Sequence, residues 1–227
     1  MRPSRLQISR DGKTGELQRS RKPSEPTVVS KPEPEPEPKP VIPWKIVTRR
    51  EIPEGAYSIA LTGHRPQALA GYNLSAPFYT ALEDGLLSIA RRALERYGKL
   101  VLHSGMALGA DTVWSKAILR LRDEFPEDVY FVAEVPVRTQ SDRWIGERDK
   151  ALWRQHVKTA DQVRIYGESY AVKWLHTRNH GMVNAADLLI AVWNGSEDGG
   201  TAEAVRYARG VGKRIHRIDP AKLKERL

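Results

Sequence analysis

Residues 100–111 read LVLHSGMALGAD. Residues 100–103 have the length and composition of a short buried strand, which Ser104-Gly105 ends. Residues 111–122 then show the spacing of a helix. A buried strand, a glycine-rich turn and a helix in immediate succession are typical of proteins with a parallel sheet.

The same order of elements repeats along the chain. The predicted strands are short apolar runs at residues 58–62, 100–103, 129–135, 162–166, 187–193 and 214–218. The predicted helices span residues 75–97, 111–122, 142–159, 171–185 and 201–209. Continuous apolar strands between helices predict a parallel sheet that is buried on both faces. We therefore expect an α/β fold, a Rossmann-like three-layer sandwich with a mainly parallel sheet.

The first 50 residues differ in composition from the rest. Residues 1–43 are poor in aromatic residues, and residues 31–40 read KPEPEPEPKP, which favours an extended polyproline II spacer. Such a segment buries too little apolar surface to offset its ordering entropy. We predict a disordered basic and Pro/Glu-rich tail over residues 1–50 and a folded domain over residues 51–227.

Most of the net charge of +9 lies in this tail. Residues 1–50 contain 12 of the 37 basic and 6 of the 28 acidic residues, which leaves a net charge of only +3 on the other 177 residues. A basic tail binds acidic partners such as nucleic acid non-specifically, or it simply keeps a chain in solution. Both interpretations stay open, and nucleic acid is a candidate partner of the tail.

The composition excludes several classes of protein. The chain has no cysteine, which rules out disulfides, a thiol nucleophile and a cysteine-ligated metal. The first thirty residues lack the apolar region of a secretory signal, and no apolar stretch approaches the roughly 20 residues of a membrane span. We expect a cytoplasmic protein with no membrane partner. The P-loop, H-E-x-x-H and G-x-G-x-x-G motifs are missing, so we predict neither a metal nor a cofactor.

Glycine and small polar residues gather where three predicted strands end. These segments are residues 62–66 (TGHRP), 104–111 (SGMALGAD) and 194–201 (NGSEDGGT). In an open parallel sheet, ligands bind beyond the carboxyl ends of the strands. Glycine permits close approach of the backbone, and a helix N-terminus offers unpaired N–H groups that suit phosphate. A tight turn explains each loop alone, but the three together predict a ligand site.

The candidate ligand-binding residues lie in these three loops and in the helix before the last of them. They are Thr62, Gly63, His64, Arg65, Ser104, Gly105, Gly109, Asp111, Asn179, Asn194, Gly199, Gly200 and Thr201. Arg65 suits a bidentate pair with phosphate oxygens. His64 either donates to the ligand or satisfies a buried carbonyl. Asp111 either caps its helix, or accepts a ribose hydroxyl or orients the glycine loop.

Arg178 and Glu203 are candidates for catalysis. Arg178 precedes the most apolar strand and either reaches a phosphate or is an ordinary surface arginine. Glu203 lies in the first turn of a helix, where a carboxylate either stabilises the helix dipole or acts on a ribose. Together they would assist cleavage of an N-glycosidic bond, the arginine holding phosphate and the carboxylate orienting ribose or acting in acid/base chemistry. The sequence leaves open whether the protein is an enzyme.

Two tryptophans, Trp144 and Trp193, lie near the predicted loops. Either one is a candidate for stacking on a nucleotide base, with packing in the core as the alternative. Trp114, Trp153 and Trp174 fall in predicted helices and are assigned to the core.

Several motifs resemble, in order, those of YpsA-like proteins of the SLOG superfamily. Residues 62–66 with Gly71-Tyr72 resemble the opening of these proteins, and residues 104–111 resemble the S-G-x-A-x-G-x-D element that is also seen in DprA. The resemblance extends roughly from Tyr57 to Pro220. The further matching segments are Trp144, Ala160-Asp161, Arg178 to Val183, Ala186-Asp187 and Gly199-Gly200-Thr201.

This resemblance implies a sensing or binding domain for a nucleotide or a nucleotide-derived molecule, ADP-ribose-like molecules included. The LOG phosphoribohydrolases of the same superfamily release a base from a nucleoside monophosphate, and Arg178, Gly200-Thr201 and Glu203 partly match their pattern. DprA-type relatives bind single-stranded DNA. Nucleotide binding is therefore our first hypothesis, with an N-glycosidase and a single-stranded DNA binder as alternatives. A homodimer is compatible with the resemblance.

Overall fold

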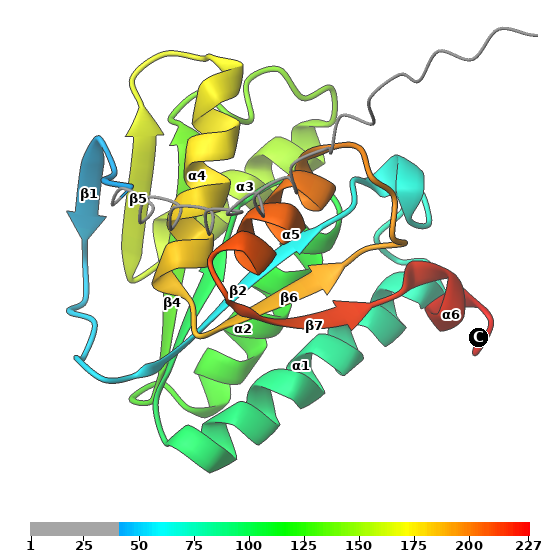
Figure 1. Cartoon of the computed structure of the whole chain (residues 1–227), viewed down its shortest axis with the longest axis horizontal. Helices are drawn as coiled ribbons and strands as arrows, with labels where there is room; N and C mark the ends of the chain where they lie inside the picture. The colour runs from blue at the N-terminus through cyan, green and yellow to red at the C-terminus, as the bar shows by residue number, and fades with distance from the viewer. Residues whose placement is uncertain (1–40) are drawn as a thin grey trace, which may run out of the picture. The chain divides into compact units, whose positions relative to one another are not determined.

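The computed structural model describes residues 41–227, and within this range seven strands form one sheet (Figure 1). Six strands run parallel in the order β5-β4-β3-β2-β6-β7, and β1 pairs antiparallel with the outer side of β5. The predicted α/β fold with a mainly parallel sheet is therefore confirmed. The strands are β1 Lys45–Thr48, β2 Tyr57–Gly63, β3 Leu100–Ser104, β4 Val129–Val137, β5 Gln162–Gly167, β6 Leu188–Val192 and β7 Arg214–Ile218.

Helices cover both faces of the sheet, which makes the three layers. One face carries α1, α2, α3 and α6, and the other carries α4 and α5 (Figure 1). The helices are α1 Pro77–Tyr97, α2 Ala110–Glu124, α3 Glu147–Thr159, α4 Val172–Ala185, α5 Gly200–Gly210 and α6 Pro220–Lys224, with a 3-10 turn η1 at Pro66–Ala68. Across residues 41–227, none of these helices has both the length and the apolar character that crossing a membrane requires.

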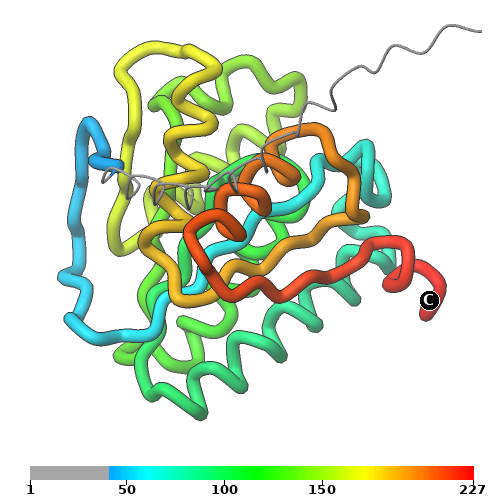
Figure 2. The backbone as a smooth tube through the Cα atoms, in the orientation of Figure 1, coloured from blue at the N-terminus to red at the C-terminus, as the bar shows by residue number. Residues whose placement is uncertain are grey.

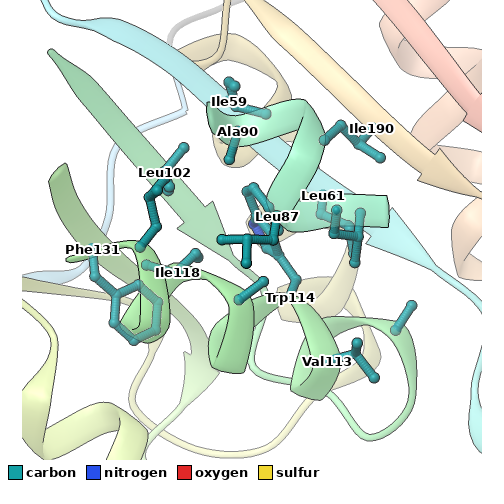
Figure 3. Close-up of a cluster of buried hydrophobic side chains, with 14 of the residues drawn as sticks. Ile59, Leu61, Leu87, Ala90, Leu102, Val113, Trp114, Ile118, Phe131 and Ile190 are labelled. Carbon is teal, nitrogen blue, oxygen red and sulfur yellow. The ribbon is translucent and has the colours of Figure 1, made fainter. Parts of the chain in front are cut away.

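The larger core lies between the sheet and helices α1 and α2. Successive residues of β2 point to opposite faces, so Ile59 and Leu61 enter this core while Ala60 faces α4. Trp114 of α2 is fully buried in the cluster of Figure 3, where Leu87 of α1 also lies. The small side chain of Ala60 suits a close approach of α4, whose position matters for the site described below.

The order of the strands reverses beside β2. The chain passes from β2 through β3 and β4 to β5 in one direction, and then returns to place β6 on the other side of β2 (Figure 2). Helix α1 follows β2 on one face, whereas α5 follows β6 on the opposite face. The two loops diverge, and such a switch point is where open α/β sheets form a crevice.

The structure differs from the sequence predictions at three places. Residues 45–48, assigned to the disordered tail, form the edge strand β1, so the sheet begins before the predicted boundary at residue 50. Helix α3 starts at Glu147 instead of residue 142, because residues 138–146 form turns that end at Gly146. The short helix α6 was not predicted. Residues 1–40 of the predicted tail lie outside the described residues.

Candidate functional site

A pocket of about 190 Å³ opens at the switch point between β2 and β6. We call it the switch-point pocket. It is enclosed by the end of β2, the loop between β3 and α2, one face of α4 and the first turn of α5. Its lining residues are Leu61, Thr62, Gly63, Arg65, Ala107, Asp111, Leu175, Arg178, Asn179, Met182, Gly200 and Thr201.

Two glycines bring the β2 loop against the start of α2. A Cβ atom on Gly63 would overlap the Cβ of Ala110, so only glycine fits where β2 meets α2. Gly109 has a φ of +98°, and a Cβ there would lie 2.5 Å from the carbonyl oxygen of His64. The amide of Ala110 donates to that carbonyl at 3.2 Å. These contacts fix the N-terminus of α2 beside the end of β2.

Arg178 and Asp111 form the buried centre of the site. Each residue is only about 5% exposed, and the Nη1 of Arg178 lies 3.7 Å from the Oδ2 of Asp111. Nη1 also donates to the carbonyl oxygen of Gly105, whereas Nε of Arg178 is buried and has no hydrogen-bond partner among residues 41–227. The alternative interpretation, that Arg178 is an ordinary surface arginine, is therefore wrong.

Asp111 organises the loop that precedes its helix. Its Oδ2 accepts a hydrogen bond from the amide of Ala107 at 3.2 Å. The N-cap residue of α2 is Gly109 and not Asp111, so the capping interpretation of Asp111 is wrong, whereas the predicted orientation of the glycine loop is present.

Burial governs the electrostatics of this pair. Burial raises the pKa of the Asp111 carboxyl, and the nearby Arg178 and Arg65 guanidinium groups oppose that rise. Burial likewise lowers the pKa of the Arg178 guanidinium, whereas the negative charge of Asp111 raises it. Keeping Asp111 and Arg178 charged in this buried position therefore costs desolvation free energy. An anion bound beside Arg178 would offset part of that cost for the guanidinium.

Helices α4 and α5 close the other side of the pocket. The Nδ2 of Asn179 donates to the carbonyl oxygen of Gly200 at 3.3 Å and to Oε2 of Glu203 at 3.2 Å. These bonds tie α4 to the first turn of α5, where Thr201 is nearly buried against the pocket. The unpaired amides of that turn lie at the same end of α5.

Several predicted site residues lie next to the pocket but do not line it. His64 and Asn194 bond each other at 2.8 Å, so the loops after β2 and β6 are joined directly, and His64 bonds an exposed amide side chain and not a buried carbonyl. Ser104 is buried and receives hydrogen bonds from the amide of Met106 and the hydroxyl of Ser115. The remaining members of this group are Gly105, Gly109, Gly199 and Glu203.

Glu203 bonds α4 instead of lining the pocket wall. Its Oε1 contacts Nε2 of His180, and Oε2 lies 3.5 Å from Nδ1 of His176. The His180 ring stacks on Tyr207 with a centroid distance of 3.7 Å. In this arrangement Glu203 acts as a contact between α4 and α5.

The two candidate stacking tryptophans differ in their surroundings. The indole of Trp193 is buried and donates to the carbonyl oxygen of Ser196, and the guanidinium groups of Arg209 and Arg217 lie 5.6 Å and 5.3 Å from its ring centroid. Trp144 is half-buried and lines a second cavity on the far side of the β3–α2 loop. Of the two, Trp144 retains a face toward open space.

Sequence reasoning missed the apolar part of the wall. Leu175 and Met182 line the pocket from α4, on the same face as Arg178 and Asn179. These four positions follow the i, i+3, i+4, i+7 spacing of one helix face. That pattern was readable in the sequence and would have added the two residues. Leu61 and Ala107 complete the unpredicted lining, and no sequence signal distinguishes them from core residues.

The family model YpsA, described as the YspA SLOG family, matches residues 59–223. The chain belongs to this family. The resemblance to YpsA-like proteins of the SLOG superfamily is thereby confirmed, and the match covers every residue that lines the switch-point pocket. A search of curated proteins gave no match.

Two solved structures of DNA processing protein A (DprA) share the fold of this family member. The Streptococcus pneumoniae protein gives a TM-score of 0.51 at 19% identity, over 72% of this chain and 50% of its own. The Helicobacter pylori protein, studied for its single-stranded DNA binding mode, gives 0.50 at 16% identity, over 75% of this chain and 72% of its own. The chain thus spans half the length of the S. pneumoniae structure, and the likeness concerns the fold.

Proposed function

We propose that the chain binds a nucleotide or a nucleotide-derived ligand in the switch-point pocket, with a phosphate group beside Arg178. The observation that carries this proposal is the buried guanidinium of Arg178, which lines the pocket and leaves Nε without a partner among residues 41–227. A buried charged donor without an acceptor is costly, and a bound anion would supply the acceptor.

The charge of the pocket supports an anionic ligand. Among the described residues that line it, Arg65 and Arg178 are basic and Asp111 alone is acidic, so the wall carries an excess of positive charge. Arginine pairs with phosphate through parallel N–H donors, and the N-terminus of α5 adds unpaired amides at the opposite wall. Membership of the SLOG family and the position of the pocket at a switch point also support a nucleotide ligand.

Polar groups beside the arginines suit the rest of a nucleotide. Thr62, Asn179 and Thr201 line the pocket and offer two hydroxyls and an amide. Hydroxyls donate and accept, so they match both phosphate oxygens and ribose hydroxyls. No catalytic role is proposed for Glu203, because its carboxylate bonds Asn179 and His180 outside the pocket wall.

The test is a titration of the purified chain with AMP, ADP and ADP-ribose, followed by calorimetry and by the melting temperature. A ligand at 100 times its dissociation constant stabilises the folded state by about 2.7 kcal/mol, which a melting curve resolves. Arg65→Ala is the variant of choice, because Arg65 lines the pocket yet is exposed. We expect it to weaken binding roughly tenfold, by loss of a charged hydrogen bond worth about 1.5 kcal/mol.

Arg92→Ala is the matched control. Arg92 is exposed on α1 and bonds only Ser88 of its own helix among the described residues, so the change removes the same charge away from the pocket. Equal affinities of the Arg65→Ala and Arg92→Ala variants would show that the pocket does not hold the phosphate. A flat response of the wild-type chain to all three ligands would refute the proposal itself.

Single-stranded DNA is the second candidate ligand, favoured by the likeness in fold to the H. pylori DprA, whose structure concerns such binding. Binding through phosphates weakens steeply with salt. The informative comparison is between the full chain and a chain that starts at residue 41, which keeps strand β1 in the sheet. Loss of DNA binding in the shorter chain would assign it to residues 1–40, and retention would assign it to the folded domain.

A further inference from the structure

The switch-point pocket is too small for a whole nucleotide. Its volume of about 190 Å³ falls below the range of roughly 300–1,000 Å³ that is usual for small-molecule sites. A ligand whose phosphate lies beside Arg178 must therefore extend out of this pocket. The direction in which it extends decides which part of the ligand the protein recognises.

A larger cavity of about 510 Å³ lies along the same edge of the sheet. We call it the aromatic slot, and its lining residues are Tyr72, Leu108, Arg143, Trp144, Ile145, Gly146 and Asp149. These residues belong to the loops after β2, β3 and β4 and to the first turn of α3, so the slot lies beyond the carboxyl ends of the strands.

The β3–α2 loop lies between the slot and the switch-point pocket and contributes to the lining of both. Ala107 lines the switch-point pocket, and the next residue, Leu108, lines the aromatic slot. Both of these residues and Trp144 also line a third, narrow cavity. The Cα atoms of the consecutive residues Ala107 and Leu108 are about 3.8 Å apart, so a ligand that occupies both sites would cross the loop at this point.

We propose that the aromatic slot binds the planar base of the ligand whose phosphate occupies the switch-point pocket, and that Asp149 selects a base with an exocyclic amino group. This inference rests on the proposed function, because it assigns the second half of the same ligand. It identifies the class as amino-bearing bases, adenine first among the purines.

The aromatic side chains of the slot are held in place and keep open faces. Trp144 packs edge-on against Trp153 with a centroid distance of 6.4 Å, and the Tyr72 hydroxyl accepts a hydrogen bond from Gln67 at 2.6 Å. The Tyr72 residue is nevertheless 56% exposed, and Ile145 is fully exposed. Rigid, exposed aromatic rings beside an apolar side chain form a stacking surface for a flat heteroaromatic ring.

Asp149 is the acidic side chain of the slot, whereas the basic side chain, Arg143, lies over the Tyr170 ring with its Cζ 4.1 Å from the ring centroid. Near Asp149, Glu147 and Lys150 pair with each other at 2.8 Å, but no hydrogen bond or ion pair to the Asp149 side chain is found within residues 41–227. The carboxylate folds over Gly146, where an added Cβ would lie 2.7 Å from Oδ2. An ionised carboxylate only accepts hydrogen bonds, so it favours an amino group and repels a carbonyl oxygen at the same position of the base.

The experiment compares AMP with ribose 5-phosphate, which lacks the base, by calorimetry on the full chain. We expect AMP to bind at least tenfold more tightly than ribose 5-phosphate. Trp144→Ala should remove this difference without weakening ribose 5-phosphate, and Trp144→Phe should retain most of it. Trp44→Ala is the control, because Trp44 is half-exposed before β1 and does not line the slot.

Asp149 is tested with AMP against IMP, which carries a carbonyl oxygen in place of the amino group. We expect AMP to bind several-fold more tightly than IMP, and Asp149→Asn to abolish that preference because an amide also donates. Equal binding of AMP and ribose 5-phosphate by the wild-type chain would overturn the base site and leave the phosphate site standing. Absence of binding by both, up to millimolar concentration, would overturn the proposed function together with this inference.

Discussion

Replacing Gly105 by alanine places a methyl group where the guanidinium of Arg178 lies. The new Cβ would overlap Nη1 of Arg178, and it would lie 2.6 Å from Cζ of the same residue and 2.7 Å from Oδ2 of Asp111. Ordinary van der Waals contacts between such atoms are about 3.5–4.0 Å, so the guanidinium must move by roughly 1 Å. The hydrogen bond from Nη1 to the Gly105 carbonyl oxygen would be broken or bent by that shift.

Two effects of the Gly105→Ala change are expected. Overpacking of a tight interior costs about 1–3 kcal/mol of stability, which urea denaturation followed by circular dichroism measures directly. Displacement of Arg178 should also remove a charged hydrogen bond to the ligand, worth about 1.5–3 kcal/mol, so AMP should bind roughly ten- to a hundredfold more weakly in calorimetry.

Gly85→Ala is the matched control, and its expected effect on stability is opposite to that of Gly105→Ala. Gly85 lies inside α1, and a Cβ there would meet nothing within 4 Å. Alanine in a helix interior is favoured over glycine by about 0.5–1 kcal/mol, so this variant should be more stable than the wild type and should bind AMP equally well. A Gly105→Ala chain as stable and as tightly binding as Gly85→Ala would refute the placement of Arg178 against Gly105.

Three further predictions concern other parts of the domain. Burial and the nearby Lys116 charge lower the pKa of His156 to about 4, while the unfolded chain keeps 6.5. Because the unfolded state takes up the proton first, the free energy of unfolding should fall by about 3 kcal/mol between pH 6.5 and pH 4, and His156→Gln should lack that part of the fall in urea titrations. Trp114→Ala should cost about 3–5 kcal/mol of stability in the same assay, because Trp114 is fully buried and its Nε1 donates to the His103 carbonyl oxygen. Glu203→Gln should lower stability by about 1 kcal/mol through its contacts with α4 and leave the AMP affinity within twofold of wild type; a large loss of affinity would instead place Glu203 in the binding site.

The sheet and its helices were predictable because their signals are local. Continuous apolar runs such as DLLIAVW at residues 187–193 mark strands that are buried on both faces, and they correspond to β2, β3, β4 and β6 with small shifts of the ends. Strands β5 and β7 were also predicted, although β7 is mostly exposed. Strand β1 was not predictable in this way, because its side chains are mostly exposed and its pairing with β5 depends on residues more than a hundred positions away.

The candidate site was predictable only as far as the rule for strand ends extends. That rule selected the three glycine loops, and the structure brings Gly63, Asp111 and Gly200 to one pocket. The sequence did not show which side chains contact each other, because Arg178 and Asp111 are 67 residues apart in the chain. The role of Glu203 as a contact with α4 depends on the packing of two helices, which no sequence spacing shows.

A buried polar cluster on the α4 side of the sheet was invisible to sequence analysis for the same reason. Glu134 is fully buried on β4 and bonds Nδ1 of His103 and the Tyr166 hydroxyl, both at 2.8 Å. In the sequence these three residues lie in separate apolar runs, where each alone is unremarkable. Tyr166 packs beneath Gly181 of α4, so the cluster helps to set the position of the helix that carries Arg178.

The central claim is that a ligand phosphate binds beside Arg178, and the Nε–H signal of that residue in a proton–nitrogen correlation spectrum tests it most directly. The signal is assigned by its loss in Arg178→Lys. Because Nε has no partner among the described residues, a phosphate that binds there should shift the signal strongly. The account predicts a saturable shift on titration with AMP and none with adenosine, which lacks the phosphate. An unmoved signal with AMP, or equal shifts with both compounds, would contradict it.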